Sequence, residues 1–412
     1  MTSADVLVVG GGPAGASVSF ALARAGVNVH VLDRARFPRP KPCAEYLSPE
    51  ASRILSAMGT LQQVEASGAA ALAGVRVRAP NGSIIAGDFV ASHGFRGFRD
   101  RGLSVRREVL DAILLDAARG AGARVSEGVR VTGLLTNAMG AVDGVTALGP
   151  SGAIELRARL IIGADGLRSV VARRLGLARA LRWPRRLALV THYANVAGVG
   201  EHGEMHVERD GYVGVADVGN GLTTVALVVP ARRAREIAAG RAAFLDAWLR
   251  ARPHLAPRVA RAERVTPVVA TGPFASQARR AWAPGAALVG DAADFFDPFT
   301  GEGIYAALRG GELLAGAARE LLAARTRSAE SRALRAYDAT RRREFGGKWI
   351  VERVIGAVVG AVPLINRAAR GLSARKELAD LLIGVTGNFV PAREVIRLGY
   401  LWGVFGPRHD VP

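Results

Sequence analysis

The most constraining feature of this chain is a glycine-rich turn, Gly10-Gly11-Gly12-Pro13-Ala14-Gly15, which directly follows the apolar run 6–9. The next residues, 17–25, contain neither proline nor glycine and suit a helix. In a strand–turn–helix unit, Gly10 permits the turn, Gly12 lets the backbone approach a pyrophosphate, and Gly15 lets the helix pack closely on the strand. The helix N-terminus then presents free N–H groups and a positive dipole end to the phosphates.

An acidic residue stands where this type of unit binds a ribose. Residues 27–32 predict a second strand, which ends at Asp33, 18 residues after Gly15. An acid at about this spacing holds a ribose hydroxyl, and we assign the adjacent Arg34 to the same binding element. The glycine motif alone would also fit a turn before an ordinary helix. The strand, the helix and Asp33 together predict a dinucleotide site.

Charge and length bound the partners of the chain. Its 412 residues suffice for two or three structural units at ~100–200 residues per domain. A formal net charge of +19 raises the prospect of a nucleic-acid or anionic-membrane partner. The arginines, however, are scattered in ones to threes, without an aromatic-and-basic cluster. We therefore expect no nucleic-acid partner, whereas peripheral attraction to a membrane surface stays open.

The cysteine and histidine content argues against disulfides and metal. Cys43 is the single cysteine, which excludes an internal disulfide and favours a reducing, cytoplasmic setting. On a predicted strand, His202 and His206 would lie ~13 Å apart at ~3.3 Å per residue, too far to share one ion, so we expect no metal. The uncharged run 6–23 lacks a preceding basic region and predicts no export signal, and the apolar run 354–365 is too short to span a bilayer.

Two further glycine motifs follow in order. They are Gly163-Ala164-Asp165-Gly166 and Gly290-Asp291-Ala292-Ala293, the latter leading into 298–303. With the first turn they resemble, over nearly the whole length, the flavoprotein superfamily that includes single-component aromatic hydroxylases and geranylgeranyl reductases, in particular the latter branch. The resemblance implies FAD as cofactor.

The resemblance also implies which residues contact FAD. Asp165 and Gly166 match the second fingerprint of the family, and Arg106 matches an arginine that approaches the cofactor. Gly290 and Asp291 match the segment at the ribityl–phosphate region, and Pro298, Gly301 and Gly303 match the segment that passes the flavin ring. A helix beginning near Gly303 would direct N–H groups and a positive dipole end at the flavin N1–C2=O, where negative charge gathers on reduction.

Four residues are candidates for catalysis. The segment Lys41-Pro42-Cys43-Ala44-Glu45 resembles a family segment whose cysteine lies beside flavin and substrate, so Cys43 and Glu45 are expected to flank the reacting carbon. Tyr46 would lie near a proton-delivery path. His192 is expected on a sheet that roofs the flavin. The alternatives are a buried thiol, a loop carboxylate and a hydrogen-bonded structural histidine.

One departure from the reductase branch bears on the reaction. That branch carries an aromatic motif ending in Trp-x-Phe-Pro, whereas this chain has Gly-Tyr-Val-Gly-Val-Ala-Asp at 211–217. We read the difference as a rebuilt pocket. It favours hydroxylation of a hydrophobic aromatic or phenolic lipid or a polyketide over the alternative, C=C reduction of a prenyl, quinone or other lipid. The sequence has no second dinucleotide fingerprint, which fits NAD(P)H as a transient electron donor.

The element pattern predicts an α/β fold with a Rossmann-like FAD-binding domain, an antiparallel β-sheet substrate domain and a helical C-terminal region. Glycines 346 and 347 predict a break within that last region. The expected boundaries are 1–75, 99–180 and 265–330 for the FAD-binding domain, 76–98 and 181–264 for the substrate domain, and 331–412 for the helical region.

Overall fold

The structure is a computed structural model that describes residues 4–43 and 45–406. Its first layer is a six-stranded sheet of order β21-β22-β12-β1-β2-β8, in which only β21 runs antiparallel to its neighbour. Every residue of β1 is buried, as expected of a strand covered on both faces. The strands are β1 (Val6–Val9), β2 (Val29–Asp33), β8 (Arg124–Glu127), β12 (Leu160–Gly163), β21 (Trp282–Ala283) and β22 (Ala286–Leu288).

Helices cover one face of this sheet and a small sheet covers the other. Helix α1 (Pro13–Arg24) packs between α4 (Arg107–Gly120) and α9 (Gly303–Ala323). A three-stranded antiparallel sheet packs on the opposite side, where its β10 contacts β12. Its strands are β9 (Arg130–Thr136), β10 (Val142–Gly149) and β11 (Gly152–Arg157), and the short α5 (Val170–Arg174) lies beside β9. The strand–turn–helix unit expected at the N-terminus is therefore present.

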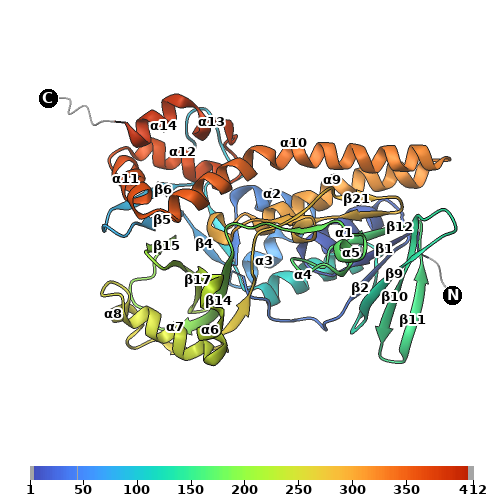
Figure 1. The fold of residues 1–412 in the computed structure, drawn as a ribbon, viewed down its shortest axis with the longest axis horizontal. Helices are drawn as coiled ribbons and strands as arrows, with labels where there is room; N and C mark the ends of the chain where they lie inside the picture. The colour runs from blue at the N-terminus through green and yellow to red at the C-terminus, as the bar shows by residue number, and fades with distance from the viewer. Residues whose placement is uncertain (1–3, 44, 407–412) are drawn as a thin grey trace.

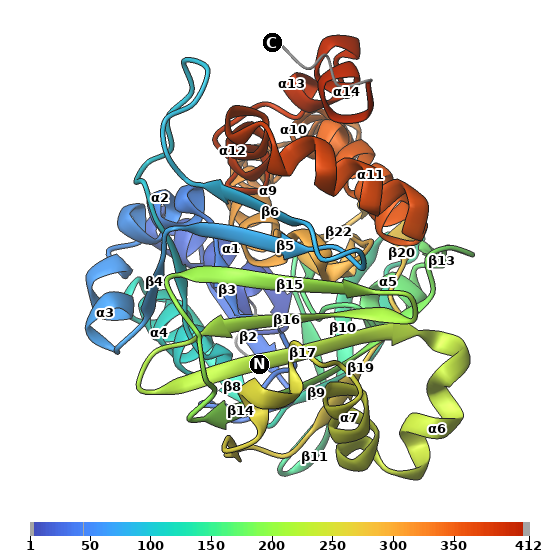
Figure 2. The ribbon, with the colours of Figure 1, turned by 90° about the vertical axis from the view of Figure 1, so that its left-hand side faces the viewer.

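The second layer is an eight-stranded sheet, which faces the viewer in Figure 2. Its order is β18-β14-β17-β16-β15-β5-β6, with β19 also paired to β14, and all pairs are antiparallel except β5 with β15. Helix α7 (Arg241–Arg250) covers the outer face. The strands are β5 (Gly74–Arg78), β6 (Ile84–Asp88), β14 (Arg186–Ala194), β15 (His202–Glu208), β16 (Gly211–Asp217), β17 (Leu222–Pro230), β18 (Glu263–Arg264) and β19 (Val269–Thr271).

The C-terminal region is helical. Helix α10 (Arg327–Val359) is the long helix in Figure 1, and α11 (Val362–Ser373) follows at an angle of 110°. The break expected at glycines 346 and 347 was wrong, because α10 continues through both. Each glycine costs a helix about 1 kcal/mol, which the rest of a 33-residue helix can outweigh. Gly347 packs closely, since a Cβ there would meet the Ala392 side chain at 3.1 Å. The remaining helices are α12 (Lys376–Thr386), α13 (Arg393–Ile396) and α14 (Leu398–Phe405).

Short elements join the layers. A small sheet of β3 (Tyr46–Leu47), β7 (Gly102–Ser104) and β4 (Ala70–Leu72) packs with α2 (Pro49–Ala57) next to α9. A second sheet joins β13 (Ala178–Ala180), β20 (Ser276–Ala278) and β23 (Asp294–Phe295). The remaining helices of the two layers are α3 (Leu61–Ala66), α6 (Ala234–Ala239) and α8 (Ala256–Val259). The predicted fold class is confirmed, and the eight-stranded sheet includes strands from both segments expected to form the substrate domain.

Among the described residues, no single helix is both long and apolar enough to cross a membrane; α10 and α11 meet those criteria only as a bent pair.

Candidate functional site

The main cavity of the protein measures about 1180 Å³ and lies between the two large sheets. It exceeds the ~300–1,000 Å³ of a typical ligand pocket, which leaves room for a dinucleotide and a substrate together. Several cationic side chains line the cavity, which suits an anionic ligand. These are Arg34, Arg39, Lys41, Arg107, Arg130, Arg168, Arg173 and Arg174.

Most of the predicted site residues line this cavity. They are Gly10, Gly12, Pro13, Ala14, Asp33, Arg34, Cys43, Glu45, Tyr46, Asp165, Gly166, Asp291, Pro298, Gly301 and Gly303. The lining does not include Gly15, Arg106, His192 or Gly290. Ala44 of the cysteine segment lies outside the described residues. Residues from four separate regions of the sequence thus meet at one site.

The glycine turn has the geometry of a phosphate cradle. Gly10 has φ +103°, and a Cβ there would lie 2.5 Å from the Ala164 carbonyl oxygen. A Cβ on Gly15 would lie 1.8 Å from the Gly10 carbonyl oxygen, so Gly15 serves the packing of α1 on β1 and does not reach the cavity. A Cβ on Gly12 would meet only the ends of two arginine side chains, at 3.5 and 3.9 Å. Gly12 therefore keeps open the space that a pyrophosphate needs.

Asp33 has a structural task besides its predicted one. Its carboxylate accepts hydrogen bonds from the Gly11 N–H at 2.7 Å and the Ala35 N–H at 2.8 Å. The end of β2 is thereby bonded to the glycine turn. Since Asp33 also lines the cavity, its carboxylate keeps lone pairs that could accept a ribose hydroxyl.

The second and third motifs each contribute a half-buried acid to the cavity. Asp165 accepts a hydrogen bond from the Val170 N–H at 2.6 Å, and its other oxygen, Oδ1, is buried without a partner. Burial also raises the pKa of Asp291, although Lys41 and Arg107 oppose that shift. An unpartnered buried acceptor and a second acid beside a glycine-lined cavity fit the hydroxyl groups of a dinucleotide.

Of the two consecutive arginines at the start of α4, Arg107 lines the cavity and the predicted Arg106 does not. Arg106 pairs with Glu108 at 2.7 Å and is absent from the lining. Arg107 is buried and held by Asp111 through two hydrogen bonds, of 2.7 and 2.8 Å. The ion pair with Asp111 fixes the Arg107 guanidinium in the cavity wall. Sequence reasoning missed Arg107, because the start of α4 does not reveal which of two consecutive arginines faces inward.

Three of the four catalytic candidates form one network. The Glu45 carboxylate contacts His192 Nε2 at 2.7 Å and accepts the Arg107 backbone N–H at 2.8 Å. The other ring nitrogen of His192 contacts the Thr266 hydroxyl at 3.0 Å. Cys43 Sγ accepts the Glu45 N–H at 3.4 Å. Glu45 faces the cavity and His192 stands behind it, so the pair can hold and move a proton at the cavity wall.

Tyr46, the fourth candidate, lies on the other side of this segment. Its hydroxyl is buried without a partner, and burial followed by the charge of Glu302 raises its pKa well above the usual value. The ring packs against the backbone of Gly301, where a Cβ would come within 2.7 Å of a ring carbon. Gly301 has φ +71° and precedes α9 by two residues, so the N-terminus of α9 opens onto the cavity beside Tyr46.

The roof of the cavity is aliphatic. The eight-stranded sheet contributes Ala188, Val190, Ala226, Val228, Ala270 and Thr271. Segment 211–217 is not part of the lining. Its Tyr212 is buried and donates a hydrogen bond to Asp297 at 2.6 Å, which also pairs with Arg186 at 2.8 Å. Segment 211–217, through Tyr212, therefore supports the loop before α9. Its difference from the reductase motif does not enlarge the pocket.

The two histidines of β15 belong to separate pairs. His202 contacts Asp88 and His206 contacts Glu204, each at 2.8 Å. Within the described part of the chain, no three His, Cys, Asp or Glu side chains are grouped so that they could hold a metal ion.

The family model of the FAD binding domain matches residues 3–348 of this chain. The chain belongs to the FAD-binding flavoprotein family. The predicted cofactor, FAD, is thereby confirmed at the level of the family.

Curated relatives include two kinds of reductase. Digeranylgeranylglycerophospholipid reductase 2 of Methanopyrus kandleri is 32% identical over 83% of each chain. Menaquinone reductase of Mycobacterium tuberculosis is 30% identical over 76% of each chain. The expected membership of the geranylgeranyl reductase and hydroxylase superfamily is thereby confirmed, and the chain is an FAD-dependent oxidoreductase.

Solved structures with the same fold include an FAD-dependent halogenase. The myxobacterial chondrochloren halogenase CndH is 25% identical with a TM-score of 0.81, over 100% of this chain and 99% of that one. Pseudomonas aeruginosa PqsL in complex with 2-aminobenzoylacetate is 25% identical with a TM-score of 0.68, over 92% and 99%. The scaffold is therefore shared among different flavin chemistries.

Proposed function

We propose that this protein is an FAD-dependent reductase that saturates a C=C bond in a hydrophobic prenyl or quinone lipid. The observation that carries the proposal is the Glu45–His192 pair at the wall of a cavity whose roof is aliphatic. This proposal reverses the preference drawn from the sequence alone, which favoured hydroxylation over C=C reduction. The argument for hydroxylation rested on a pocket rebuilt at 211–217, and that segment does not line the cavity.

The reaction needs a hydride and a proton on adjacent carbons. Bound FAD, once reduced, supplies the hydride and with it both electrons. We assign the proton to Glu45, which is held on one oxygen by the Arg107 N–H and contacts His192 through the other. His192 can return a proton to Glu45 after each turnover, while Thr266 keeps the imidazole ring in place. Cys43 lines the same wall and positions the Glu45 backbone.

The substrate class follows from the roof and the relatives. Alanine and valine side chains offer an apolar, sterically simple surface that suits an aliphatic chain. The two relatives named above are reductases whose names specify a geranylgeranyl phospholipid and menaquinone. NAD(P)H is the proposed electron donor, bound only transiently, which agrees with a sequence that has one dinucleotide fingerprint.

Hydroxylation is the second candidate, because PqsL and the halogenase show that this scaffold supports flavin chemistry on other substrates. Anaerobic turnover separates the two reactions. The protein is reduced with NADPH or dithionite and incubated anaerobically with a geranylgeranyl lipid or menaquinone. The masses of the products are then measured by mass spectrometry. We expect a gain of two hydrogen atoms per reduced bond. Conversion only in air, with labelled oxygen found in the product, would establish hydroxylation in its place.

A membrane surface is the proposed source of the substrate. On α14, Leu398 is 85% exposed and Trp402 is 65% exposed, and four residues of spacing place them on one side of the helix. Arg393 and Arg397 lie within the preceding turns, with side chains 71% and 62% exposed, and both pair with Glu394, at 3.2 and 2.7 Å. Apolar and aromatic side chains beside arginines fit the interface of an anionic bilayer.

A further inference from the structure

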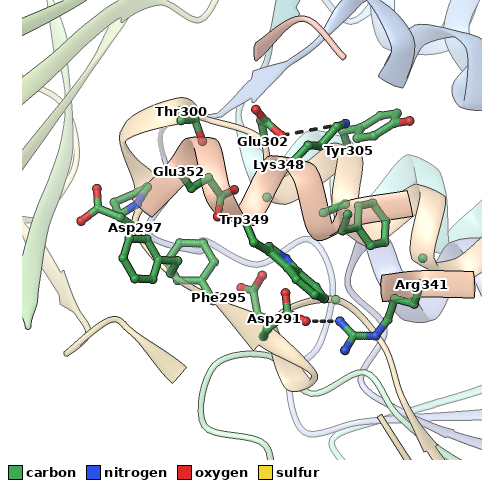
Figure 3. A pocket seen from close by; sticks show the side chains of 18 residues that line it. Asp291, Phe295, Asp297, Thr300, Glu302, Tyr305, Arg341, Lys348, Trp349 and Glu352 are labelled. Carbon is green, nitrogen blue, oxygen red and sulfur yellow. Dashed lines mark hydrogen bonds and ion pairs between the residues drawn. The ribbon is translucent and has the colours of Figure 1, made fainter. Parts of the chain in front are cut away.

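A second, small cavity of about 50 Å³ shares lining residues with the main one, and Figure 3 shows the side chains around it. Asp291, Phe295, Pro298 and Gly303 line both, so the 295–303 loop is the wall between them. The far side of the small cavity is formed by α10, which contributes Lys348 and Glu352. None of the functions assigned above uses this space.

Two acids share one cation in the small cavity. Glu302 immediately precedes α9 and is buried, and Lys348 Nζ lies 3.9 Å from its Oε2. Glu352 follows Lys348 by one helical turn and lines the same cavity, so both project from one side of α10. Buried like charges cannot both stay ionised without compensation. With one ammonium for two carboxyl groups, one of the acids should keep a proton.

Asp291, which lines the same cavity, interacts electrostatically with Lys41 and Arg107 on the side of the main cavity. Four further acids around the cluster are each paired with an arginine. Asp294 pairs with Arg341, Asp297 with Arg186, Glu344 with Arg309, and Glu50 with Arg53. The uncharged phenols of Tyr46 and Tyr305 face the cluster from β3 and α9, the latter with Lys348 Nζ 4.2 Å from its ring centre. Among these described groups, Lys348 is the cation that remains for Glu302 and Glu352.

We propose that Glu302, Lys348 and Glu352 form a proton store behind the 295–303 loop, which takes up or releases one proton as the charge of the cofactor in the main cavity changes. The link is electrostatic and needs no covalent step. When two electrons arrive at the cofactor, negative charge grows on the other side of the loop, and a proton from solvent enters the cluster in response. Tyr46, whose ring borders the main cavity, lies between the two sites.

The titration of the cluster supports this role. Burial raises the pKa of Glu302 to about 7, although Lys348 opposes the shift. Burial, together with Glu302 and Asp294, holds the pKa of Glu352 well above its usual range. Burial also lowers the pKa of Lys348. The store is therefore poised near neutral pH, where a modest change in nearby charge moves its proton.

The pH dependence of the flavin potential tests the proposal. With the cofactor oxidised, the cluster should lose a proton as the pH rises through the neutral range, since the pKa of Glu302 is raised to about 7. In the reduced protein the added negative charge keeps the proton bound to higher pH. Above about pH 7, reduction should therefore draw in an extra proton, and the wild-type midpoint potential should fall more steeply with pH than that of Glu302→Gln or Glu352→Gln.

Infrared spectroscopy supplies a readout that does not need bound flavin. Wild-type protein near neutral pH should show the C=O band of a buried protonated carboxyl group, and at least one of the two glutamine variants should lose it. Glu344→Gln is the matched control, because Glu344 is on the same helix but pairs with Arg309 at 3.0 Å. The proposal is overturned if both variants keep the wild-type band and slope, or if Glu344→Gln changes them equally. It depends on FAD binding and not on which substrate is reduced, so it can fail separately.

Discussion

The carboxylate of Glu45 and the imidazole of His192 lie 2.7 Å apart, although 147 residues separate them. Glu45 has φ +63°, a left-handed conformation that costs a non-glycine residue about 1 kcal/mol or more. The backbone N–H of Arg107 and the side chain of His192 hold it in this conformation. A loop residue kept in a strained conformation by partners from α4 and β14 is the arrangement expected of a group that must point in one direction.

We predict that Glu45→Gln lowers turnover by ~10²–10⁴-fold while FAD stays bound, because the variant keeps the shape of the carboxyl group and loses its proton. His192→Gln should reduce turnover in the same direction. The matched control is His202→Gln, which disrupts a similar pair with Asp88 on the same sheet, away from the main cavity. Steady-state assays with flavin content measured by absorbance check the prediction, and equal losses in all three variants would contradict it.

The glycine turn allows a test that separates folding from cofactor binding. Gly12→Val should abolish FAD binding and leave the thermal stability of the apoprotein nearly unchanged, because the added carbons enter space bordered only by the tips of Arg39 and Arg107. Gly316→Ala on α9, whose Cβ would meet nothing within 4 Å, is the control and should keep FAD. Flavin absorbance and melting of the apoproteins are the measurements. Normal FAD content in Gly12→Val would refute the assignment of the cradle.

The parts of the site that depend on residues close together in the sequence could be predicted, whereas the parts that depend on distant residues could not. The glycine turn, Asp33 and the segment leading into α9 were predicted because their function follows from neighbouring residues. Arg107 was missed because one residue of helix register decides which arginine faces inward. The pairing of Lys348 with Glu302 depends on how α10 lies against the 295–303 loop, which no short pattern encodes. The sequence motif likewise did not reveal that segment 211–217 lies outside the cavity lining, because this depends on where the strand lies in the sheet.

Membrane docking predicts a charge-dependent association. Wild-type protein should sediment with vesicles containing phosphatidylglycerol more than with pure phosphatidylcholine, and Leu398→Glu and Trp402→Glu should each weaken that binding. Each basic residue near an anionic surface adds ~1 kcal/mol, so raising the salt concentration should weaken it as well. Met139→Glu, at a loop residue that is 71% exposed between β9 and β10, is the matched control. Equal losses in all three variants would place the contact elsewhere.

The last prediction concerns stability and pH. Glu204 on β15 accepts hydrogen bonds from Arg258 and His206. Burial alone would raise its pKa, but these two partners outweigh burial and lower the pKa to about 2. Because the folded value lies below the unfolded value of ~4.3, the stabilisation is complete at neutral pH and is lost as the pH falls toward 2. Glu204→Gln should therefore be less stable than wild type by about 1–2 kcal/mol at pH 7, and the difference should shrink between about pH 5 and pH 2. Urea unfolding at several pH values measures it, and a difference that stays constant across that range would mean that the carboxylate charge is not the source of the stability.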